Sequence, residues 1–277
     1  MPILHAIVLG IVQGLTEFLP ISSSGHLILV PELFGWNELT SDPELNKTFD
    51  VALHIGTFVG VAWYFRLDIV RYVRAALRSL RNRAIDDVDE RIAWLLALSA
   101  VPGAIVGALL NDFIDDELGR PILIGVMLIA FAVVLQVADR LPGTRHAEGF
   151  ALRDAALMGM AQALALQPGV SRAGATISMG RWLRFDRDAA TRLSFLMSLP
   201  IIAGAALFET VDVVVDGGIE SDLVAPFAWG MVTAAVSGFF AVAWLLRLLR
   251  THSFTPFVIY RVLLGASVIV VFATGAR

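Results

Sequence analysis

Residues 13–26 read QGLTEFLPISSSGH, and residues 167–176 read QPGVSRAGAT. Each motif interrupts a stretch that is otherwise apolar, Ile3–Leu33 in the first case and Ala155–Leu183 in the second. Proline, glycine and polar side chains in the middle prevent either stretch from forming one continuous membrane-spanning helix. Non-helical backbone at membrane depth is tolerated only where protein or trapped water satisfies its polar groups. We therefore predict two re-entrant helix pairs, which decide the fold.

The composition of the whole chain is that of a membrane protein. Of 277 residues, 57% are hydrophobic and 17% are charged, whereas about a quarter of the residues of a soluble domain are charged. The chain has no cysteine, which excludes disulfide scaffolds, zinc ribbons, iron–sulfur clusters and cysteine nucleophiles. The net charge of −4 excludes only a broadly basic surface that would coat nucleic acid. The first ten residues lack a cationic region, so we expect no cleavable signal peptide.

Six further stretches are long and apolar enough to cross a bilayer, which takes about 20 residues. They are Thr48–Phe65, Ile92–Leu110, Pro121–Ala138, Leu193–Val215, Leu223–Leu246 and Phe257–Ala273. The predicted fold class is therefore an all-α integral membrane protein with six transmembrane helices and two re-entrant helix pairs. We treat residues 1–277 as a single polytopic membrane domain.

Arginine is concentrated in four of the connections between these segments. Seven arginines lie in Arg66–Arg91, three in Asp139–Asp154, four in Arg181–Arg192 and two in Arg247–His252. The opposite connections, Asn111–Arg120 and Asp212–Asp222, are acidic. By the positive-inside rule the arginine-rich connections face the cytoplasm. We expect a multi-pass protein of the cell (inner or plasma) membrane.

The first arginine-rich connection has an amphipathic pattern. Val70, Val73, Leu77 and Leu80 recur at three- and four-residue steps among arginines, which predicts a helix with one apolar face. Such a helix could lie on the inner headgroup surface or serve as an ordinary solvated connector. The sequence leaves both interpretations open.

The two interrupted stretches belong to an internal repeat. A shift of 149 residues aligns Gly10, Gln13, Leu15, Ser22 and Gly25 with Gly159, Gln162, Leu164, Ser171 and Gly174. Each stretch is followed by three spans, the first set starting outside and the second inside. We predict an inverted-topology repeat with halves at about 1–139 and 149–277. Such repeats place the functional site near the midplane, where the broken helices of the two halves meet.

The first motif places an acid at membrane depth. Gln13 and Glu17 are four residues apart and project from one face of a helix. An intramembrane carboxylate is costly and by default marks a functional site, although Glu17 could instead be a structural carboxylate that holds a helix end or an arginine. The hydroxyls of Ser22–Ser24 could cap the returning helix, bind an anion, or do both. His26 is either a packing residue or a titrating group.

The second motif contains Arg172. A buried guanidinium needs an anionic partner, and Glu17 could supply it. Alternatively, Arg172 faces a phosphate, because its planar fork binds oxyanions bidentately. Ser171, Thr176 and glycine-opened backbone could then complete the anion site. No Walker sequence occurs, so nucleotide binding by that route is unsupported.

The two motifs together resemble the signatures of the integral-membrane undecaprenyl-diphosphate phosphatases of the bacitracin-resistance type, and the similarity in segment order extends over essentially the whole chain. The resemblance implies removal of the terminal phosphate of undecaprenyl diphosphate, which yields the lipid monophosphate carrier for cell-envelope glycan synthesis. It also implies a divalent cation, Mg²⁺ or Ca²⁺, and a site that opens to the outer face. The expected partners are the polyprenyl diphosphate and membrane lipid, without nucleic acid, while a homodimer stays open.

The resemblance also implies roles for individual residues. We expect the catalytic residues to be Glu17, Ser23, His26 and Arg172. We expect the substrate to be bound by Gln13, Ser22, Ser24, Gly169, Ser171, Gly174 and Thr176. Glu17 is also the expected metal ligand. Gln13 stands where many members of the family have a second glutamate, and Ala173 replaces a frequent serine.

We expect a two-step phosphoryl transfer. The residues that would hold the diphosphate are Arg172, Ser171 and Thr176, with a metal ion sharing the charge. Ser23, activated by Glu17, would attack the terminal phosphorus, and water would then hydrolyse the phosphoserine. His26 would protonate the leaving oxygen or activate that water. Ser22 as nucleophile and direct attack by water stay open.

A rival interpretation is a secondary transporter or lipid flippase with a midplane site. Inverted repeats with broken helices are also typical of that class, and Glu17 could then relay protons. A membrane scaffold without chemistry ranks last, because it leaves both polar turns unexplained.

Three further polar residues lie near or within the predicted spans, namely Asp50, His54 and Arg261. The sequence indicates no specific chemistry for any of them. Helix-end anchoring is therefore the default expectation.

Overall fold

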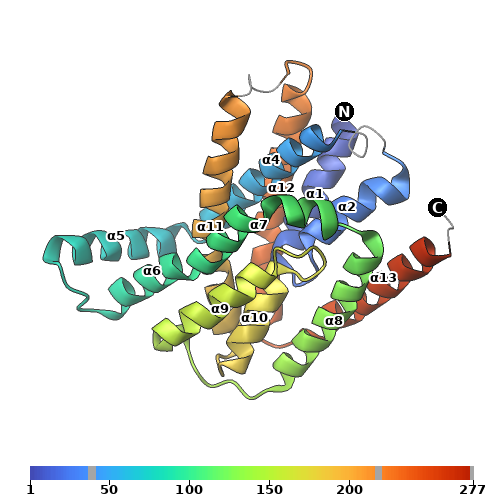
Figure 1. Cartoon of the computed structure of the whole chain (residues 1–277). Helices are drawn as coiled ribbons and strands as arrows, with labels where there is room; N and C mark the ends of the chain where they lie inside the picture. Colours follow the sequence, from blue (N-terminus) through green and yellow to red (C-terminus); the bar gives the residue numbers. More distant parts are fainter. Residues whose placement is uncertain (37–41, 216–219, 275–277) are drawn as a thin grey trace.

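The computed structural model describes residues 1–36, 42–215 and 220–274, and helices make up nearly all of this part of the chain (Figure 1). The helices are α1 (Ile3–Phe18), α2 (Ser23–Phe34), α4 (Pro43–Tyr64), α5 (Arg66–Asn82), α6 (Val88–Ser99), α7 (Val101–Glu117), α8 (Pro121–Arg140), the short 3-10 helix Ala147–Gly149, α9 (Leu152–Leu164), α10 (Arg172–Trp182), α11 (Arg187–Val215), α12 (Val224–Leu248) and α13 (Thr255–Ala273). Residues 216–219, within the predicted acidic connection Asp212–Asp222, lie outside the described residues. The predicted all-α class is confirmed.

Five helices in the described chain are long and apolar enough to cross a membrane. They are Val88–Leu110, which joins α6 to the first part of α7, then α8, the Arg187–Phe208 part of α11, α12 and α13. The pair α4–α5 passes the same test together but bends by 84°, and the bend lies at Phe65, between the two helices. The count therefore reaches the predicted six only if this bent pair is one span. The chain is a multi-pass membrane protein.

Neither interrupted stretch forms one continuous helix, as predicted. The first helix pair breaks between Phe18 and Ser23, and the second between Leu164 and Arg172. Pro20 has no backbone N–H and cannot donate a hydrogen bond within a helix. Ser22 has a φ of 75°, which lies outside the right-handed helical region. Helix α1 contacts α2, α4 and α10, so the two breaks lie close together inside the molecule.

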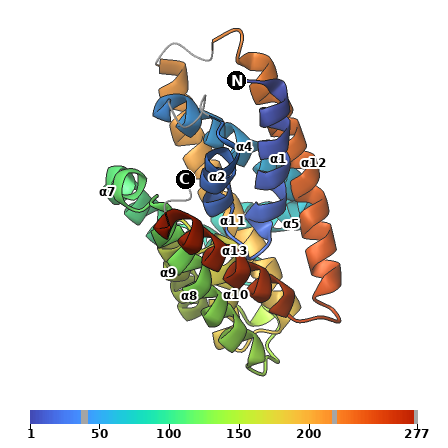
Figure 2. The same ribbon diagram turned by 90° about the vertical axis from the view of Figure 1, so that its right-hand side faces the viewer.

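Helix α12 packs between α1 and α4, and Figure 2 shows α1 and α12 side by side. The contact faces carry glycines four residues apart, Gly10 and Gly14 on α1 and Gly56 and Gly60 on α4. A Cβ atom at Gly14 would lie 2.5 Å from the carbonyl oxygen of Ala234, and one at Gly60 would lie 2.3 Å from that of Ala235. Small residues let membrane helices approach backbone to backbone. This approach holds α1 and α4 in place on α12.

Helices α8 and α13 pair in the same way. A Cβ atom at Gly125 would lie 2.9 Å from the carbonyl oxygen of Gly265, and one at Gly265 would lie 2.6 Å from that of Gly125. The reciprocal contact fixes α13 against α8, so the buried Arg261 of α13 is held in a rigid position.

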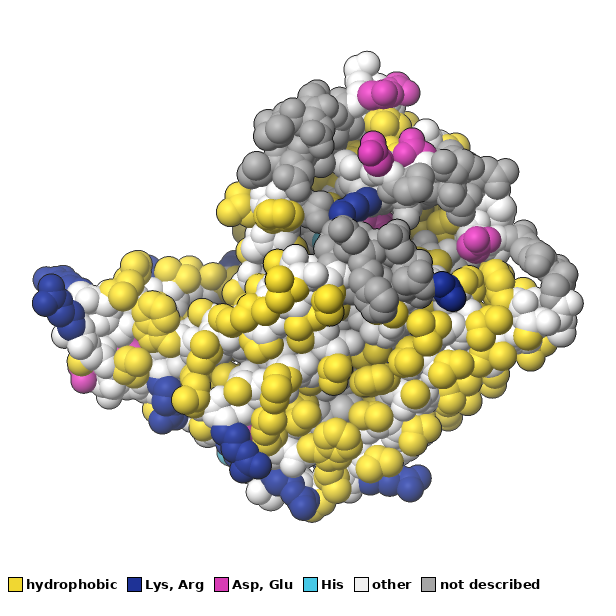
Figure 3. All heavy atoms as spheres, viewed as in Figure 1, with side chains coloured by type: hydrophobic (Ala, Val, Ile, Leu, Met, Phe, Trp, Pro, Cys, Tyr) yellow, Lys and Arg dark blue, Asp and Glu magenta, His cyan; other side chains and the backbone are white. Residues whose placement is uncertain are grey.

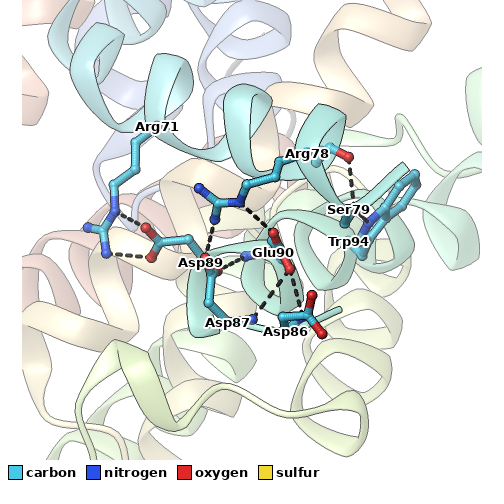
Figure 4. Close-up of polar contacts among 9 residues, drawn as sticks. Arg71, Arg78, Ser79, Asp86, Asp87, Asp89, Glu90 and Trp94 are labelled. Carbon is cyan, nitrogen blue, oxygen red and sulfur yellow. Dashed lines mark hydrogen bonds and ion pairs between the residues drawn. The ribbon is translucent and has the colours of Figure 1, made fainter. Parts of the chain in front are cut away.

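Helices α5 and α6 form an arm that projects from the body (Figure 1). Figure 4 shows Arg71 bound to Asp89 and Arg78 bound to Glu90, each through its Nε atom at 2.6 Å. Trp94 donates to the hydroxyl of Ser79 at 2.8 Å. The predicted helix is confirmed, and its apolar residues Val70, Val73, Leu77 and Leu80 are exposed. Its position relative to a membrane stays a prediction.

The molecular surface separates charge by sign. On the face shown in Figure 3, most basic side chains gather at the tip of the arm and along the lower edge, and most acidic side chains lie at the upper end. Apolar side chains cover the region between them. A broad apolar band between two charged ends is typical of a protein surrounded by lipid.

We predict that Gly60→Ala destabilises the protein and that Gly204→Ala does not. Alanine has a higher helix propensity than glycine at both positions, but a Cβ atom at Gly60 meets the backbone of α12, whereas nothing lies within 4 Å of one at Gly204. Thermal unfolding of the purified variants in detergent should show a lower apparent Tm for Gly60→Ala only. Equal Tm values for the two variants would contradict the proposed backbone contact.

Candidate active site

Glu17 lies in the last turn of α1 and is buried. One carboxylate oxygen, Oε1, accepts a hydrogen bond from the guanidinium of Arg172. The other, Oε2, accepts from the hydroxyl of Ser23 and from Nε2 of Gln13, the latter at 3.1 Å. The structure thus brings together an acid, a hydroxyl and a guanidinium from the two motifs, as the sequence predicted. The contact also fits the alternative in which Glu17 neutralises Arg172.

Two matching helix caps create this meeting point. Ser22 and Ser171 have φ angles of 75° and 71°, and their hydroxyls accept backbone N–H bonds from Gly25 at 3.4 Å and Gly174 at 3.1 Å, respectively. Ser23 and Arg172 are therefore the first residues of α2 and α10. Helix N-termini carry partial positive charge and free N–H groups, which favour a bound anion.

The first turn (residues 19–22, between α1 and α2) and the second turn (residues 165–171, between α9 and α10) are also joined directly. The backbone N–H of Gly169 donates to the Ser22 hydroxyl at 3.1 Å, so this oxygen accepts from both turns. The Ser24 hydroxyl lies 3.4 Å from that of Ser22. Ser22 is consequently a structural acceptor in this arrangement, whereas the Ser23 hydroxyl contacts only the Glu17 carboxylate among the described residues.

Thr176 lies deeper than expected. Its hydroxyl donates to the Arg172 carbonyl at 2.7 Å and lies 2.6 Å from the Ser194 hydroxyl. The side chain is fully buried and does not line the cavity described below. Its contacts stabilise the first turn of α10 and hence the backbone of Arg172.

Two histidines lie near the site, and His54 rather than His26 lines the cavity described below. His26 is buried, with Nδ1 2.6 Å from the Ser22 carbonyl and Nε2 2.7 Å from the Tyr260 hydroxyl. His54, on α4, instead places Nε2 3.6 Å from Glu17 Oε2 and lines the cavity. Helix-end anchoring is therefore wrong for His54. A histidine in the middle of an apolar span was the available signal.

Arg261 also departs from the expected helix-end anchoring. It lies in the middle of α13, is fully buried, and donates only to backbone carbonyls among the described residues. Two of these carbonyls belong to Gly169 and Val170, in the second turn. An arginine that faced lipid or water would snorkel instead.

A cavity of about 300 Å³ opens beside these groups. Its polar lining consists of Glu17, Ser22, Ser23, Ser24, His54, Gln162, Ser171 and Arg172. Its apolar lining consists of Val51, Ala165, Leu166, Ile201, Ile202, Ala205 and Ala206. The predicted residues Gln13, His26, Gly169, Gly174 and Thr176 do not line this cavity. A lining that contains both polar and apolar side chains suits an amphiphilic ligand.

The residues at hand offer few oxygen ligands for a metal ion. No group of three or more His, Cys, Asp or Glu side chains that could hold a metal occurs among the described residues. Gln13 Oε1, however, is buried without a hydrogen-bond partner among the described residues, and Nε2 of the same amide donates to the Glu17 carboxylate. A carboxylate and a free amide oxygen fit a hard cation that takes its remaining ligands from phosphate and water.

Comparisons with known proteins cover nearly the whole chain. The sequence model of the family described as "Bacitracin resistance protein BacA" matches residues 6–267. A relative named undecaprenyl-diphosphatase from Nocardioides sp. (strain ATCC BAA-499 / JS614) is 47% identical over 279 residues, covering 98% of this chain and 97% of the relative. Relatives with the same name are 47% identical in Pelobacter propionicus, covering 99% of both chains, and 46% identical in Geobacter sulfurreducens, covering 97% and 98%.

We predict that substitutions of Glu17 and Arg172 have strongly non-additive effects on the thermal stability of the protein. Removing one member of a buried ion pair leaves the other charge uncompensated, at a cost of about 3–5 kcal/mol. Glu17→Gln and Arg172→Gln should therefore each lower the apparent Tm, and the double variant should lose much less than the sum of the two. Additive losses of Tm would mean that the two side chains do not pair.

Proposed function

Since the chain belongs to the bacitracin resistance protein BacA family, we propose that it is an undecaprenyl-diphosphatase, which removes the terminal phosphate of undecaprenyl diphosphate. The product is the lipid monophosphate that carries glycan precursors of the cell envelope. The observation that carries the proposal is the shared carboxylate of Glu17, which binds both the Ser23 hydroxyl and the Arg172 guanidinium at the polar end of an amphiphilic cavity.

Arg172 holds the diphosphate. Only one of its nitrogens, Nη2, is bound to Glu17, and a guanidinium has five N–H donors. The remaining donors are available to phosphate oxygens in bidentate geometry. The N-termini of α2 and α10 add backbone dipoles that favour the same anion. Charge neutralisation and positioning of this kind supply most of the catalysis of phosphoryl transfer.

Ser23 is the nucleophile. Its hydroxyl proton already points at Glu17 Oε2, which takes that proton as the Ser23 oxygen bonds to the terminal phosphorus. The anhydride P–O bond breaks, and its electron pair leaves with the lipid monophosphate. Water then hydrolyses the phosphoserine and regenerates the hydroxyl. The two N–H bonds to the Ser22 hydroxyl make that residue the poorer candidate.

The histidines would serve different parts of the reaction. His26 has both ring nitrogens within hydrogen-bond distance of Ser22 and Tyr260, which supports a role in orienting the first turn of α2. His54 is the imidazole that lines the cavity beside Glu17. His54 is therefore better placed than His26 to transfer a proton to the leaving oxygen.

A divalent cation, Mg²⁺ or Ca²⁺, completes the proposed site. Gln13 Oε1 and the Glu17 carboxylate would hold it. Such an ion would neutralise charge on the diphosphate. Gln13 otherwise positions Glu17 through its amide N–H.

We also propose that the chain is an inverted repeat with six spans in the cell membrane. What supports the repeat is that α1 and α9 begin at Ile3 and Leu152, and α2 and α10 at Ser23 and Arg172, so both pairs are shifted by 149 residues. The capping serines also share one backbone conformation.

The cavity would open to the outer face. Its residue Val51 lies in the half of α4 nearer Asp42, and His54 lies at the middle of that helix. The lining residues of α11 run from its midpoint, Ile201, toward the acidic connection. The arginine-rich ends of the same helices lie opposite, and these face the cytoplasm by the positive-inside rule. The lipid chain would leave along the apolar lining residues of α4, α11 and the end of α9.

We predict that Ser23→Ala lowers phosphate release from undecaprenyl diphosphate at least 100-fold, whereas Ser22→Ala, which weakens a cap, keeps a measurable rate. Phosphate should be measured colorimetrically with the purified protein in detergent, and a radiolabelled terminal phosphate should mark the parental enzyme but not Ser23→Ala. A matched control is Ser267→Ala on the exposed face of α13, whose hydroxyl donates to the Leu263 carbonyl of the same helix at 2.9 Å.

Full activity of Ser23→Ala with loss in Ser22→Ala would reassign the nucleophile. Full activity of both variants would favour direct attack by water. No phosphate release by the parental protein would instead support a transporter or flippase.

A further inference from the structure

Arg261 is a fully buried cation that binds both interrupted turns. Its Nη1 donates to the Pro20 carbonyl at 3.1 Å, and its Nη2 donates to the carbonyls of Gly169 and Val170 at 2.8 and 2.9 Å. Its Nε donates to the Leu128 carbonyl on α8 at 3.1 Å. One planar guanidinium therefore spans three segments that are distant in the sequence.

The carbonyls that Arg261 binds lie just before the two strained positions of the site. Pro20 precedes Ser22 by two residues, and Val170 directly precedes Ser171. Ser22 and Ser171 have positive φ angles, and so does Gly169, at 93°. Such conformations persist only where the surroundings determine them. The bonds from Arg261 supply that restraint on both turns at once.

The neighbouring residue adds a further contact to the first turn. Tyr260 lies 2.7 Å from His26 Nε2 through its hydroxyl, and the two rings stack with centroids 5.7 Å apart. Helix α13 is itself fixed on α8 through the Gly125–Gly265 contact. The pair Tyr260–Arg261 thus connects the site to a rigid part of the fold.

We infer that Arg261 is a positioning residue for the reaction, which holds the two turns in the register that keeps Ser23 and Arg172 on one carboxylate. This inference rests on the proposed function for its kinetic consequence, although its structural part can be tested without turnover. The hydrogen bonds of Arg261 within the described residues go to backbone carbonyls and not to the Glu17 carboxylate. Its effect on the rate therefore acts through the backbone of the two turns.

The kinetic test compares Arg261→Lys with Arg181→Met. A lysine ammonium is a compact point charge that cannot reach all four carbonyls. Arg181 is the matched control, because it is also buried and also donates to backbone carbonyls, including that of Phe185 at 2.6 Å, but at the arginine-rich end. Misplacement of reacting groups by about 1 Å costs about 100-fold in rate. We expect kcat to fall about 100-fold in Arg261→Lys, with a much smaller change in KM. In Arg181→Met we expect kcat to stay near the parental value, even if both variants lose thermal stability.

The structural test measures the distance between the turns. Because the chain has no cysteine, nitroxide labels on Leu33→Cys of α2 and Leu164→Cys of α9, both exposed, report one pair of sites by pulsed electron paramagnetic resonance. We expect one narrow distance distribution in the parental background and in Arg181→Met, and a broadened or shifted one in Arg261→Lys. If Arg261→Lys cannot be purified, Gly174→Ala takes its place, because its Cβ atom would lie 2.8 Å from Arg261 Nη1 and displace the guanidinium.

A parental kcat and an unchanged distance distribution in Arg261→Lys would overturn the inference. Equal losses of kcat in Arg261→Lys and Arg181→Met would also overturn it, since the effect would then be one of general stability. An inactive parental protein would contradict the proposed function, while the distance distributions would still decide whether Arg261 holds the turns.

Discussion

The ion pair between Glu17 and Arg172 joins two segments that lie 155 residues apart in the sequence. Each charge would be costly at membrane depth without the other, so the pair determines where the two interrupted helices can end. Once they meet, Ser23 at the start of α2 and Arg172 at the start of α10 share one carboxylate. The same contact keeps a serine hydroxyl, a carboxylate and a guanidinium together beside one cavity.

The rest of the fold makes this meeting possible. Irregular backbone survives in a membrane only when protein satisfies its polar groups, and Arg261 and the capping serines do so for the two turns. Glycine contacts bring α1 and α4 against α12, and α8 against α13. Close helix packing thus provides the rigid frame, while Ser22 and Ser171 adopt strained conformations with positive φ at the site itself.

Much of this arrangement could be predicted from the sequence, because its signals are local. Proline and serine in apolar stretches indicated the breaks, and the repeat indicated that Ser23 and Arg172 occupy equivalent positions. The contacts of His26, His54 and Arg261 could not be predicted, because they depend on how α2, α4 and α13 are rotated about their axes. A helix in a membrane can present any face to its neighbours, and only the packing decides which residue reaches the site.

The most direct measurement is the rate of phosphate release from undecaprenyl diphosphate by Arg172→Lys, compared with the parental protein at equal folded concentration. A lysine keeps the positive charge but cannot bind Glu17 and a phosphate through one planar fork. We expect the rate to fall at least 100-fold, because an electrostatic donor aimed at the developing charge is lost. A rate within a few-fold of the parental value would contradict the central role of this contact between the two turns.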